Sequence, residues 1–349
     1  MLNCDFAAVQ RRFDQYWRRE NHDRPLVAVT APRDGADLGR RVPAPSGLES
    51  RWFDMDYVIA RNRLAMENTA YHGEAFPTFY PNLGPDILGA ICGCGLEFGE
   101  DTSWAVHSVE DWRRQPDIRF DEDNAWWRRI LRMTRDAVSD AGDDYVVGVT
   151  DLHPGSDALV SLRGPEETCL DTIECPELLW KFDRQIFEVY KTVYARLYAE
   201  IAPLGNGSSY WMGVWSDKRH YVVGSDFSCM VSPDAYESLI APSVESEIAF
   251  LDRSIYHLDG PLALRHLDRI LKMEGLDGVQ WVYGAGQPSP RHWISVLKKI
   301  QDAGKCIDIY GPPEDLPELM RHLGPEGLLY HCSCDSEDEA RDLLKAVAR

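Results

Sequence analysis

The chain has 349 residues, a length compatible with two small domains or with one large barrel. Hydrophobic residues make up 44% of it and charged residues 27%, the balance of a globular protein that folds without disulfides or a structural metal. The formal net charge of −20 disfavours nucleic acid and anionic membrane surfaces as partners.

The cysteines and the N-terminal segment predict where the protein works. Nine cysteines in a chain of this length do not indicate a disulfide framework. Residues 1–20 lack the apolar core of a signal peptide, and Phe6, Val9, Phe13 and Trp17 have the spacing of an amphipathic helix. No apolar run approaches the length of a membrane span. We therefore predict a cytoplasmic protein with reduced thiols.

Strand-like segments alternate with helical ones, which favours a parallel sheet. The first predicted strand covers residues 25–30. Residues 31–140 depart from the alternation, with helices predicted near 51–71 and 124–139, and we interpret them as the first barrel units plus a decorating insertion. From residue 145 the alternation is regular, with strands predicted at 145–150, 209–215, 254–258, 278–283, 305–310 and 327–332 and helices at 176–202, 233–251, 262–273, 289–303, 313–322 and 336–348.

The number and character of these strands predict the fold class. Short, continuously apolar strands suit a sheet that is buried on both faces, and their count reaches about eight. We therefore expect an α/β fold, a single (β/α)8 TIM barrel over residues 1–349 with an N-terminal helical and loop insertion. An open doubly wound sheet is the alternative, although no glycine-rich dinucleotide motif follows any predicted strand.

Polar residues stand where the predicted strands end, and in a barrel the carboxyl ends of the strands form the active site. Asp226 follows one strand, His257 and Asp259 end another, and Gln280 lies in the next. We therefore expect Asp226, His257 and Asp259 to be the catalytic residues.

The His257-Leu258-Asp259 spacing predicts a metal site. In a strand, residues i and i+2 point to the same side, so an imidazole and a carboxylate can reach one ion. A thiolate from Cys332 or Cys334 would complete a set of ligands that suits zinc. The alternative is that His257 and Asp259 are hydrogen-bonding loop residues and that the cysteines are small buried groups.

Two aromatic clusters and one basic pair are candidates for binding a substrate. Tyr80 and Asn82 belong to the segment FYPNLGP, and Trp215 and Trp281 are the aromatic neighbours of other strand ends. Aromatic walls with a few polar groups, here including Gln280, are typical of small-molecule sites, and core packing is the alternative. Arg265 and His266 could hold an acidic group of the substrate or form a surface pair.

Three segments, SIYHLDGPLALRHLD, SDFSCMVSP and DGVQWVYGAGQP, resemble the uroporphyrinogen decarboxylase superfamily, and within it a branch beside the zinc-dependent corrinoid methyltransferases. The likeness covers most of the chain from about Tyr145 onward and extends loosely into FPTFYPNLGPDILGAICGC. It implies a (β/α)8 barrel, in agreement with the alternation of strands and helices.

The resemblance also bears on the chemistry. The methyltransferases hold zinc with a His-x-Cys pair and a later cysteine, and here Asp259 stands where the first cysteine would be. A carboxylate donates less charge than a thiolate, which leaves the zinc a stronger Lewis acid. The arginines of APRDGADLGRRVPAP do not match the basic motif of the decarboxylases, so porphyrin decarboxylation is disfavoured.

These observations lead to three hypotheses. The first is a zinc-dependent methyltransferase-like enzyme that acts on a small organic substrate with a separate corrinoid protein as partner. The second is a metal-free decarboxylase or lyase in which Asp226, His257 and Asp259 serve as acid, base and orienting group. The third is a non-catalytic protein that binds a small molecule between Tyr80, Trp215 and Trp281. The oligomeric state stays open, a homodimer included.

Overall fold

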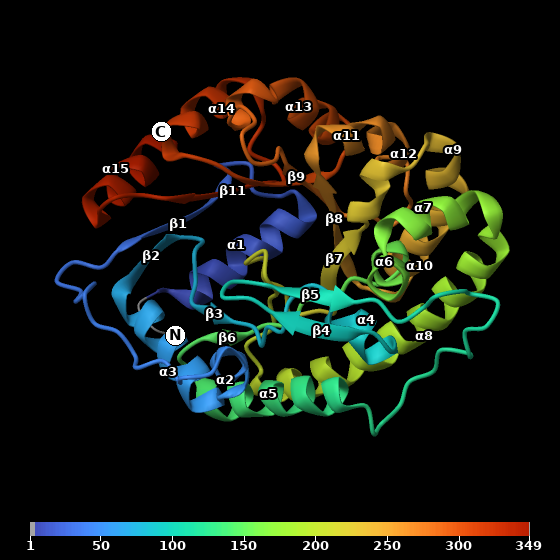
Figure 1. Cartoon of the computed structure of the whole chain (residues 1–349). Helices are drawn as coiled ribbons and strands as arrows, with labels where there is room; N and C mark the ends of the chain where they lie inside the picture. Colours follow the sequence, from blue (N-terminus) through green and yellow to red (C-terminus); the bar gives the residue numbers. More distant parts are fainter. Residues whose placement is uncertain (1–3, 349) are drawn as a thin grey trace.

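Parallel strands form the central sheet of the protein, whose computed structural model describes residues 4–348 (Figure 1). The sheet has seven strands in the order β2-β1-β11-β10-β9-β8-β7, and only β2 runs antiparallel to its neighbour. Their bounds are β1 (Leu26–Pro32), β2 (Thr69–Gly73), β7 (His220–Gly224), β8 (Arg253–Asp259), β9 (Gly278–Val282), β10 (Cys306–Tyr310) and β11 (Leu328–Ser333). The predicted α/β fold with a mostly parallel sheet is confirmed.

Four further strands lie outside this ladder, and two of them form a short parallel pair. β3 (Thr78–Phe79) and β6 (Val146–Val147) pair in parallel, and an isolated bridge joins Gly148 to Ser209. Within residues 4–348 the seven-stranded sheet and the β3–β6 pair are separate hydrogen-bonded sheets. The closed eight-stranded barrel is therefore not confirmed by the hydrogen-bond ladder.

One predicted strand is wrong. Residues 209–215 contribute only the bridge at Ser209, and the backbone then turns through Gly213, whose φ is +66°. Glycine adopts this left-handed conformation without the steric penalty of a side chain. The strand of this region is β7, which begins at His220, so Trp215 precedes a strand instead of ending one.

Helices cover the outer side of the sheet. Figure 1 shows α13, α14 and α15 outside β9, β10 and β11, and the two long helices α5 and α8 pack against each other. The α-helices from α5 onward are α5 (Ala125–Ala141), α6 (Ser156–Arg163), α7 (Pro165–Glu174), α8 (Pro176–Ile201), α9 (Pro233–Ala235), α10 (Ala241–Phe250), α11 (Gly260–Ala263), α12 (Leu267–Ile270), α13 (Ile294–Asp302), α14 (Leu316–His322) and α15 (Glu337–Val347). None of the helices within residues 4–348 is both long enough and apolar enough to cross a membrane.

Helix α1 (Phe6–Arg18) covers the amino ends of the strands. The predicted amphipathic face is confirmed, since α1 buries Val9, Phe13 and Trp17. The indole of Trp17 donates to the carbonyl of Trp215, 2.8 Å away, shortly before β7. The Cys306 thiol, at the first residue of β10, donates to the carbonyl of Tyr16 at 3.3 Å. The carboxyl ends of the strands therefore open at the opposite end of the sheet.

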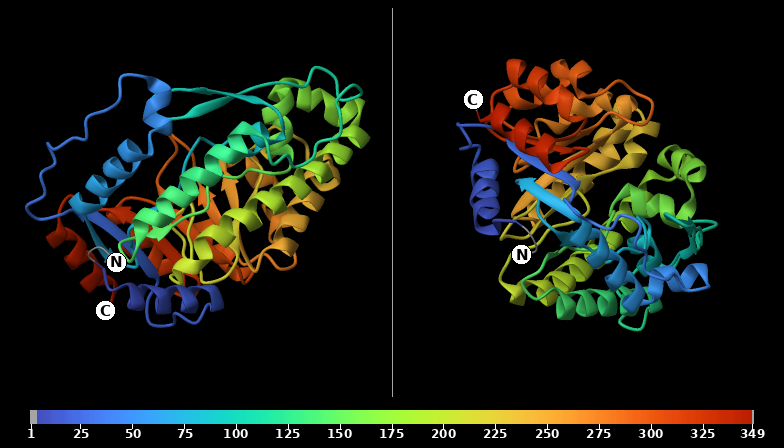
Figure 2. Two further views of the ribbon diagram at one scale, coloured as in Figure 1. Left: turned by 90° about the horizontal axis from the view of Figure 1, so that it is seen from below. Right: turned by 90° about the vertical axis from the view of Figure 1, so that its left-hand side faces the viewer.

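Residues 31–140 supply β2, β3 and an outer layer. The layer contains α2 (Leu48–Phe53), α3 (Met55–Asn68), α4 (Ile87–Cys92) and a hairpin of β4 (Gly95–Phe98) and β5 (Ser103–Val106). In the left view of Figure 2 the hairpin and α2 lie at the end of the molecule opposite α1. This segment therefore covers the end at which the parallel strands finish.

Candidate functional site

Asp226, His257 and Asp259 lie together at the carboxyl ends of β7 and β8. His257 and Asp259 are two residues apart at the end of β8, and Asp226 opens a short 3-10 helix (Asp226–Met230) directly after β7. One ligand atom from each lies within 4.8 Å of the others. Strand alternation thus brings His257 and Asp259 to one side, as their spacing predicted.

The two carboxylates of this triad leave it with an excess of negative charge. The Asp226 and Asp259 side chains are exposed, and the His257 ring is largely buried. His257 Nε2 lies 3.7 Å from Asp226 Oδ1, beyond hydrogen-bond distance. Partial burial and the neighbouring Asp226 carboxylate raise the pKa of Asp259, although His257 acts in the opposite direction. A cation between the two carboxylates would relieve this repulsion.

The imidazole of His257 is oriented by a hydrogen-bonded chain of buried side chains behind it. His257 Nδ1 lies 2.6 Å from Gln280 Oε1, and Gln280 Nε2 lies 3.1 Å from Asp308 Oδ1. Because the Asp308 carboxylate accepts, the Gln280 amide nitrogen must face it and the amide oxygen must face His257. His257 then donates through Nδ1–H, which leaves the lone pair of Nε2 directed at the two aspartates.

The series of hydrogen-bonded side chains continues to the next strand but one after β9, which is β11. Asp308 is fully buried, and its Oδ2 lies 3.3 Å from Nε2 of His331 on β11. Strand register builds the first three members of the series, since Gln280 pairs with both His257 and Asp308. We call the four side chains His257, Gln280, Asp308 and His331 the polar chain.

Asp226 is held in place through its backbone. The Asp157 carboxylate accepts hydrogen bonds from the backbone N–H groups of Asp226 and Phe227 at 3.1 and 3.0 Å, and from the Ser225 hydroxyl at 3.1 Å. Burial and the nearby Asp226 carboxylate raise the pKa of Asp157, whereas His153 and these backbone donors act in the opposite direction. Asp157 fixes the start of the 3-10 helix and thereby the direction of the Asp226 side chain.

A second imidazole and a buried acid lie beside the triad. Burial lowers the pKa of His153, but Asp151, which lies 2.8 Å from its Nε2, acts with Asp157 and Asp226 to outweigh burial, and the net result is a pKa of about 10. Burial raises the pKa of Glu247 well above its usual value, and both of its oxygens lack a hydrogen-bond partner within residues 4–348. A small cavity of about 10 Å³ is lined by these two side chains together with Asp157, Asp226 and His257.

The structure does not bring the two predicted cysteine ligands to the triad. Cys332 and Cys334 lie on and just after β11, three strands away from β8, and both are buried. Burial and the neighbouring Cys334 raise the pKa of Cys332 to about 12, so its thiol keeps its proton at neutral pH. The prediction of zinc held by His257, Asp259 and a cysteine therefore fails in its sulfur ligand, and Asp226 takes that place in the cluster.

Two predicted binding residues lie in the core instead. Trp215 is 3% exposed and packs against Phe6 and Phe13 near α1, at the wrong end of the strands for the triad. Trp281 is 1% exposed and packs edge-on against Trp293, because it alternates with the inward-facing Gln280. Neither ring reaches the carboxyl ends of β7 and β8.

The remaining predicted binding residues are engaged in local structure. Asn82 Oδ1 accepts from the backbone N–H of Gly84, and the Arg265 guanidinium donates to the carbonyls of Leu262 and Cys229. His266 is buried, with Nε2 3.0 Å from the Ser228 carbonyl.

Tyr80 lies beside the β3–β6 pair. It is half-buried, and its Cβ packs closely against Gly148. Burial and nearby Asp151 raise its pKa to about 12.

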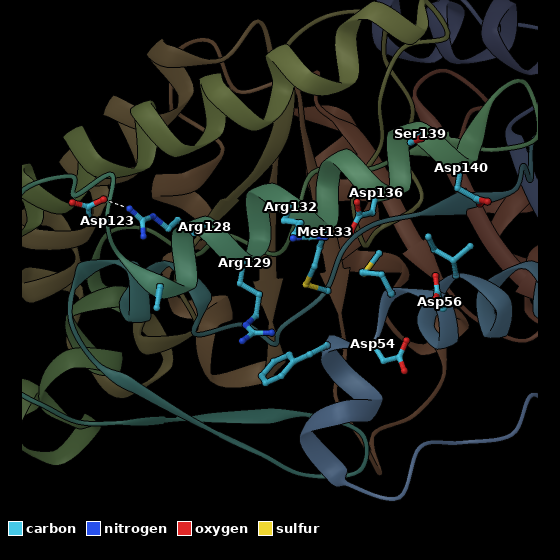
Figure 3. A pocket seen from close by; sticks show the side chains of 14 residues that line it. Asp54, Asp56, Asp123, Arg128, Arg129, Arg132, Met133, Asp136, Ser139 and Asp140 are labelled. Atoms are coloured by element: carbon cyan, nitrogen blue, oxygen red, sulfur yellow. Dashed lines mark hydrogen bonds and ion pairs between the residues drawn. The ribbon is translucent and has the colours of Figure 1, made fainter.

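A wide surface groove lies between α2, α3 and α5 (Figure 3), and its volume is about 1000 Å³. Its three arginines follow one another along α5, with aspartates at both ends of the run, and the Arg129 guanidinium stacks 3.8 Å from the centre of the Phe53 ring. No residue of the groove belongs to a strand of the central sheet. The groove is therefore separate from the triad and offers no imidazole or thiol for chemistry.

The sequence reasoning missed Asp157, Glu247 and Asp308 as parts of the site. Asp308 was hidden inside the apolar strand CIDIY, where a lone acid in an otherwise apolar run is itself a signal of a buried hydrogen-bonded network. Glu247 gave no such signal, because the same helix also contains Glu245, which is only half-buried.

The fold is similar to that of a methyltransferase from Methanosarcina mazei. The two structures superpose with a TM-score of 0.61 at 13% sequence identity, and the match covers 98% of each chain. Neither a protein-family model nor a curated protein sequence matches this chain. At this identity the likeness is one of fold, over the whole length of both proteins.

Proposed function

We propose that the protein is a zinc-dependent, methyltransferase-like enzyme that acts on a small organic substrate. The observation that carries the proposal is the orientation of His257, whose Nδ1 is bonded to Gln280 and whose Nε2 lies 3.7 Å from Asp226, in one cluster with Asp259. The barrel fold that the family resemblance implies, and the methyltransferase that shares the architecture, support the same class of enzyme.

The three side chains fit a zinc ion in kind and in spacing. One imidazole and two carboxylates are ligands that zinc accepts, and three protein ligands leave a coordination position open, as catalytic zinc sites require. The ligand atoms lie within 4.8 Å of one another, and Asp226 and Asp259 are exposed enough to close on an ion by side-chain rotation. When bound, zinc would supply Lewis-acid activation of a group on the substrate.

The other residues of the site act on the ligands. Gln280 and Asp308 keep the proton of His257 on Nδ1, so that Nε2 is a free lone pair. Asp157 holds the backbone of Asp226, and the His153 cation moderates the negative charge of the two carboxylates.

A separate corrinoid protein is our proposed source of the methyl group, with free methylcobalamin as its stand-in for assays. A thiol acceptor would lose its proton and gain the methyl group, and cob(I)alamin would be released. Because carboxylates replace the thiolates of the related zinc sites, hydroxyl and thiol acceptors should both be tested.

The test is the metal content of the protein purified without chelators. We expect about one zinc per chain in the wild type and less than a tenth of that in His257→Ala. The matched control is His322→Ala, because His322 is an exposed histidine that pairs only with Glu318. An equal zinc content in all three proteins would contradict the proposal.

The two alternatives predict other results. A protein without metal after incubation with zinc, in which Asp226→Asn still abolishes turnover, would be the metal-free decarboxylase or lyase. A protein without metal and without turnover of any methyl donor or carboxylate would be the binding protein.

A further inference from the structure

A second cavity lies at the carboxyl ends of β1, β10 and β11, on the far side of the polar chain from the triad. Its volume is about 510 Å³, within the usual range for small-molecule sites. Most of its lining is apolar, including Ala28, Ala75, Phe76 and Pro312. None of the described residues that line it is Lys, Arg, Asp or Glu. We call it the β11 cavity.

Besides Thr30 and Ser333, whose hydroxyls bond each other at 2.9 Å, His331 is a polar group with which a ligand in the β11 cavity could bond. Its Nε2 faces the buried Asp308 carboxylate, to which it donates. Its Nδ1 has no hydrogen-bond partner within residues 4–348. An imidazole whose proton lies on Nε2 presents Nδ1 as an acceptor, so it calls for an O–H or N–H donor on the ligand.

The shape of the wall favours a flat ring. The Tyr310 and His331 rings stack with their centroids 4.2 Å apart and their planes 5° from parallel. Tyr310 is 43% exposed, an unusual position for a tyrosine whose hydroxyl is already bonded to the Met212 carbonyl. A planar ligand would cover this aromatic surface by offset stacking.

The β11 cavity is connected to the triad in two ways. The polar chain runs from His331 through Asp308 and Gln280 to His257. Residues 211–213 bridge the same gap, since Trp211 packs edge-on against His257, 5.1 Å between ring centroids, and Gly213 lines the cavity. A molecule in the cavity is therefore linked to the triad indirectly, through Asp308 and Gln280 on one path and through residues 211–213 on the other.

We propose that the β11 cavity binds a neutral, flat ring compound that donates one hydrogen bond to His331 Nδ1. The inference goes beyond the proposed function and concerns binding alone, because Cys332, which lines the β11 cavity, lies three strands away from β8. The binding itself depends on the cavity and on the Asp308–His331 pair, not on zinc.

The first experiment compares 2-naphthol with 2-naphthoate, which share a ring system and differ in charge and in hydrogen-bond role. Binding to chelator-treated protein is measured by calorimetry at pH 7.5. We expect 2-naphthol to bind at least tenfold more tightly, because Nδ1 accepts and no cation lines the cavity to receive a carboxylate. Equal affinities, tighter binding of 2-naphthoate or no binding of 2-naphthol would overturn the proposal.

Two further measurements keep the result tied to His331. His331→Phe preserves a flat apolar wall and removes the acceptor, and it should weaken 2-naphthol three- to tenfold, the usual range for one hydrogen bond. His322→Phe, an exposed control on α14, should leave the affinity unchanged. Unchanged affinity in His331→Phe would overturn the assignment.

Because His331→Phe deprives Asp308 of a partner, the wild type provides a test that does not depend on folding of the variant. Crystals soaked with 6-bromo-2-naphthol should place bromine in the β11 cavity and the hydroxyl beside His331. Bromine bound elsewhere would contradict the proposal. Zinc content is measured on the same preparation. It distinguishes the proposed zinc site from the proposed ring-binding cavity, because zinc binding can be absent while naphthol binds, and naphthol binding can be absent while zinc binds.

Discussion

The acidic side chains at the two ends of the sheet differ in whether they have partners of opposite charge. At the amino ends, the Glu74 carboxylate is 2% exposed and is fully engaged. It pairs with the Arg24 guanidinium at 2.6 and 3.0 Å and accepts from the backbone N–H of Val27 at 2.7 Å. At the carboxyl ends, Asp226 and Asp259 face each other and an imidazole without any arginine or lysine in the group.

This difference separates acids that are saturated with partners in the fold from acids that are free to bind a ligand. A carboxylate that is paired and saturated with donors stabilises the fold, and its loss leaves an uncompensated charge in the interior. Carboxylates that repel each other at an exposed strand end contribute little to stability, and a ligand can supply the missing charge. Substitutions at the two ends should therefore affect different measurements.

The largest effect should come from Glu74→Ala. Removal of this carboxylate leaves Arg24 partly buried without its partner, which should lower the free energy of unfolding by about 3–5 kcal/mol. Urea denaturation measures it. The matching change at the other end, Asp259→Asn, should shift the free energy of unfolding by less than about 1 kcal/mol. Similar losses in the two variants would break the comparison.

Asp226→Asn should have its effect on metal affinity. Loss of one of three ligands should weaken zinc by more than the roughly 10–100-fold that loss of a supporting residue costs. Competition with a chelating dye measures this affinity. Asp234→Asn, an exposed acid eight residues later, is the control and should bind zinc like the wild type. Wild-type affinity in Asp226→Asn would remove Asp226 from the site.

The pH dependence of stability should report a buried acid at the edge of the site. Burial raises the pKa of Asp183 to about 6, although the Ser243 hydroxyl donates to it at 2.8 Å. The folded state then holds this proton more tightly than the unfolded state, so stability is fully present below about pH 4 and is lost as the pH rises through 6. The loss is at most about 3 kcal/mol for a shift of this size.

Asp183→Asn isolates this contribution, because asparagine does not titrate. Between pH 4 and pH 7.5 the free energy of unfolding should decrease less in the variant than in the wild type. The same fall in both proteins would assign the pH dependence to other groups.

The smallest of the expected effects belongs to Gln280→Leu. The variant keeps a side chain of similar size but removes the acceptor for His257 Nδ1–H. Zinc affinity should therefore fall about tenfold. Leucine also leaves Asp308 with one donor fewer, so Gln280→Glu serves as a second variant. A glutamate can accept from His257 and should retain more zinc affinity than leucine. Equal affinities in the three proteins would show that the polar chain does not support the ligand.

The sequence was informative where the evidence is local. Alternating apolar runs located the strands from β8 to β11 to within one or two residues, because each is a short buried segment with turns on both sides. The i, i+2 spacing placed His257 and Asp259 on one side of β8. Asp226 was expected beside them, but β7, the strand that brings it there, was not predicted.

The features of the site that could not be predicted from the sequence depend on which strands pair and in which register. Cys332 and Cys334 looked like ligands by residue type, but the order of strands puts β11 three positions from β8. His331, of the opposite parity, reaches inward in their place. Asp308 gains its role only from its register with Gln280, a contact between residues 28 positions apart. Trp215 was misplaced because the turn at Gly213 ends the extended segment before it becomes a strand.

The most direct test of the metal site is X-ray absorption at the zinc edge of the zinc-loaded protein. The triad predicts a first shell of nitrogen and oxygen atoms at about 2.0–2.2 Å, with one imidazole and no sulfur. His257→Ala should lose the imidazole signal. A sulfur shell near 2.3 Å would contradict the triad and return Cys332 or Cys334 to the metal.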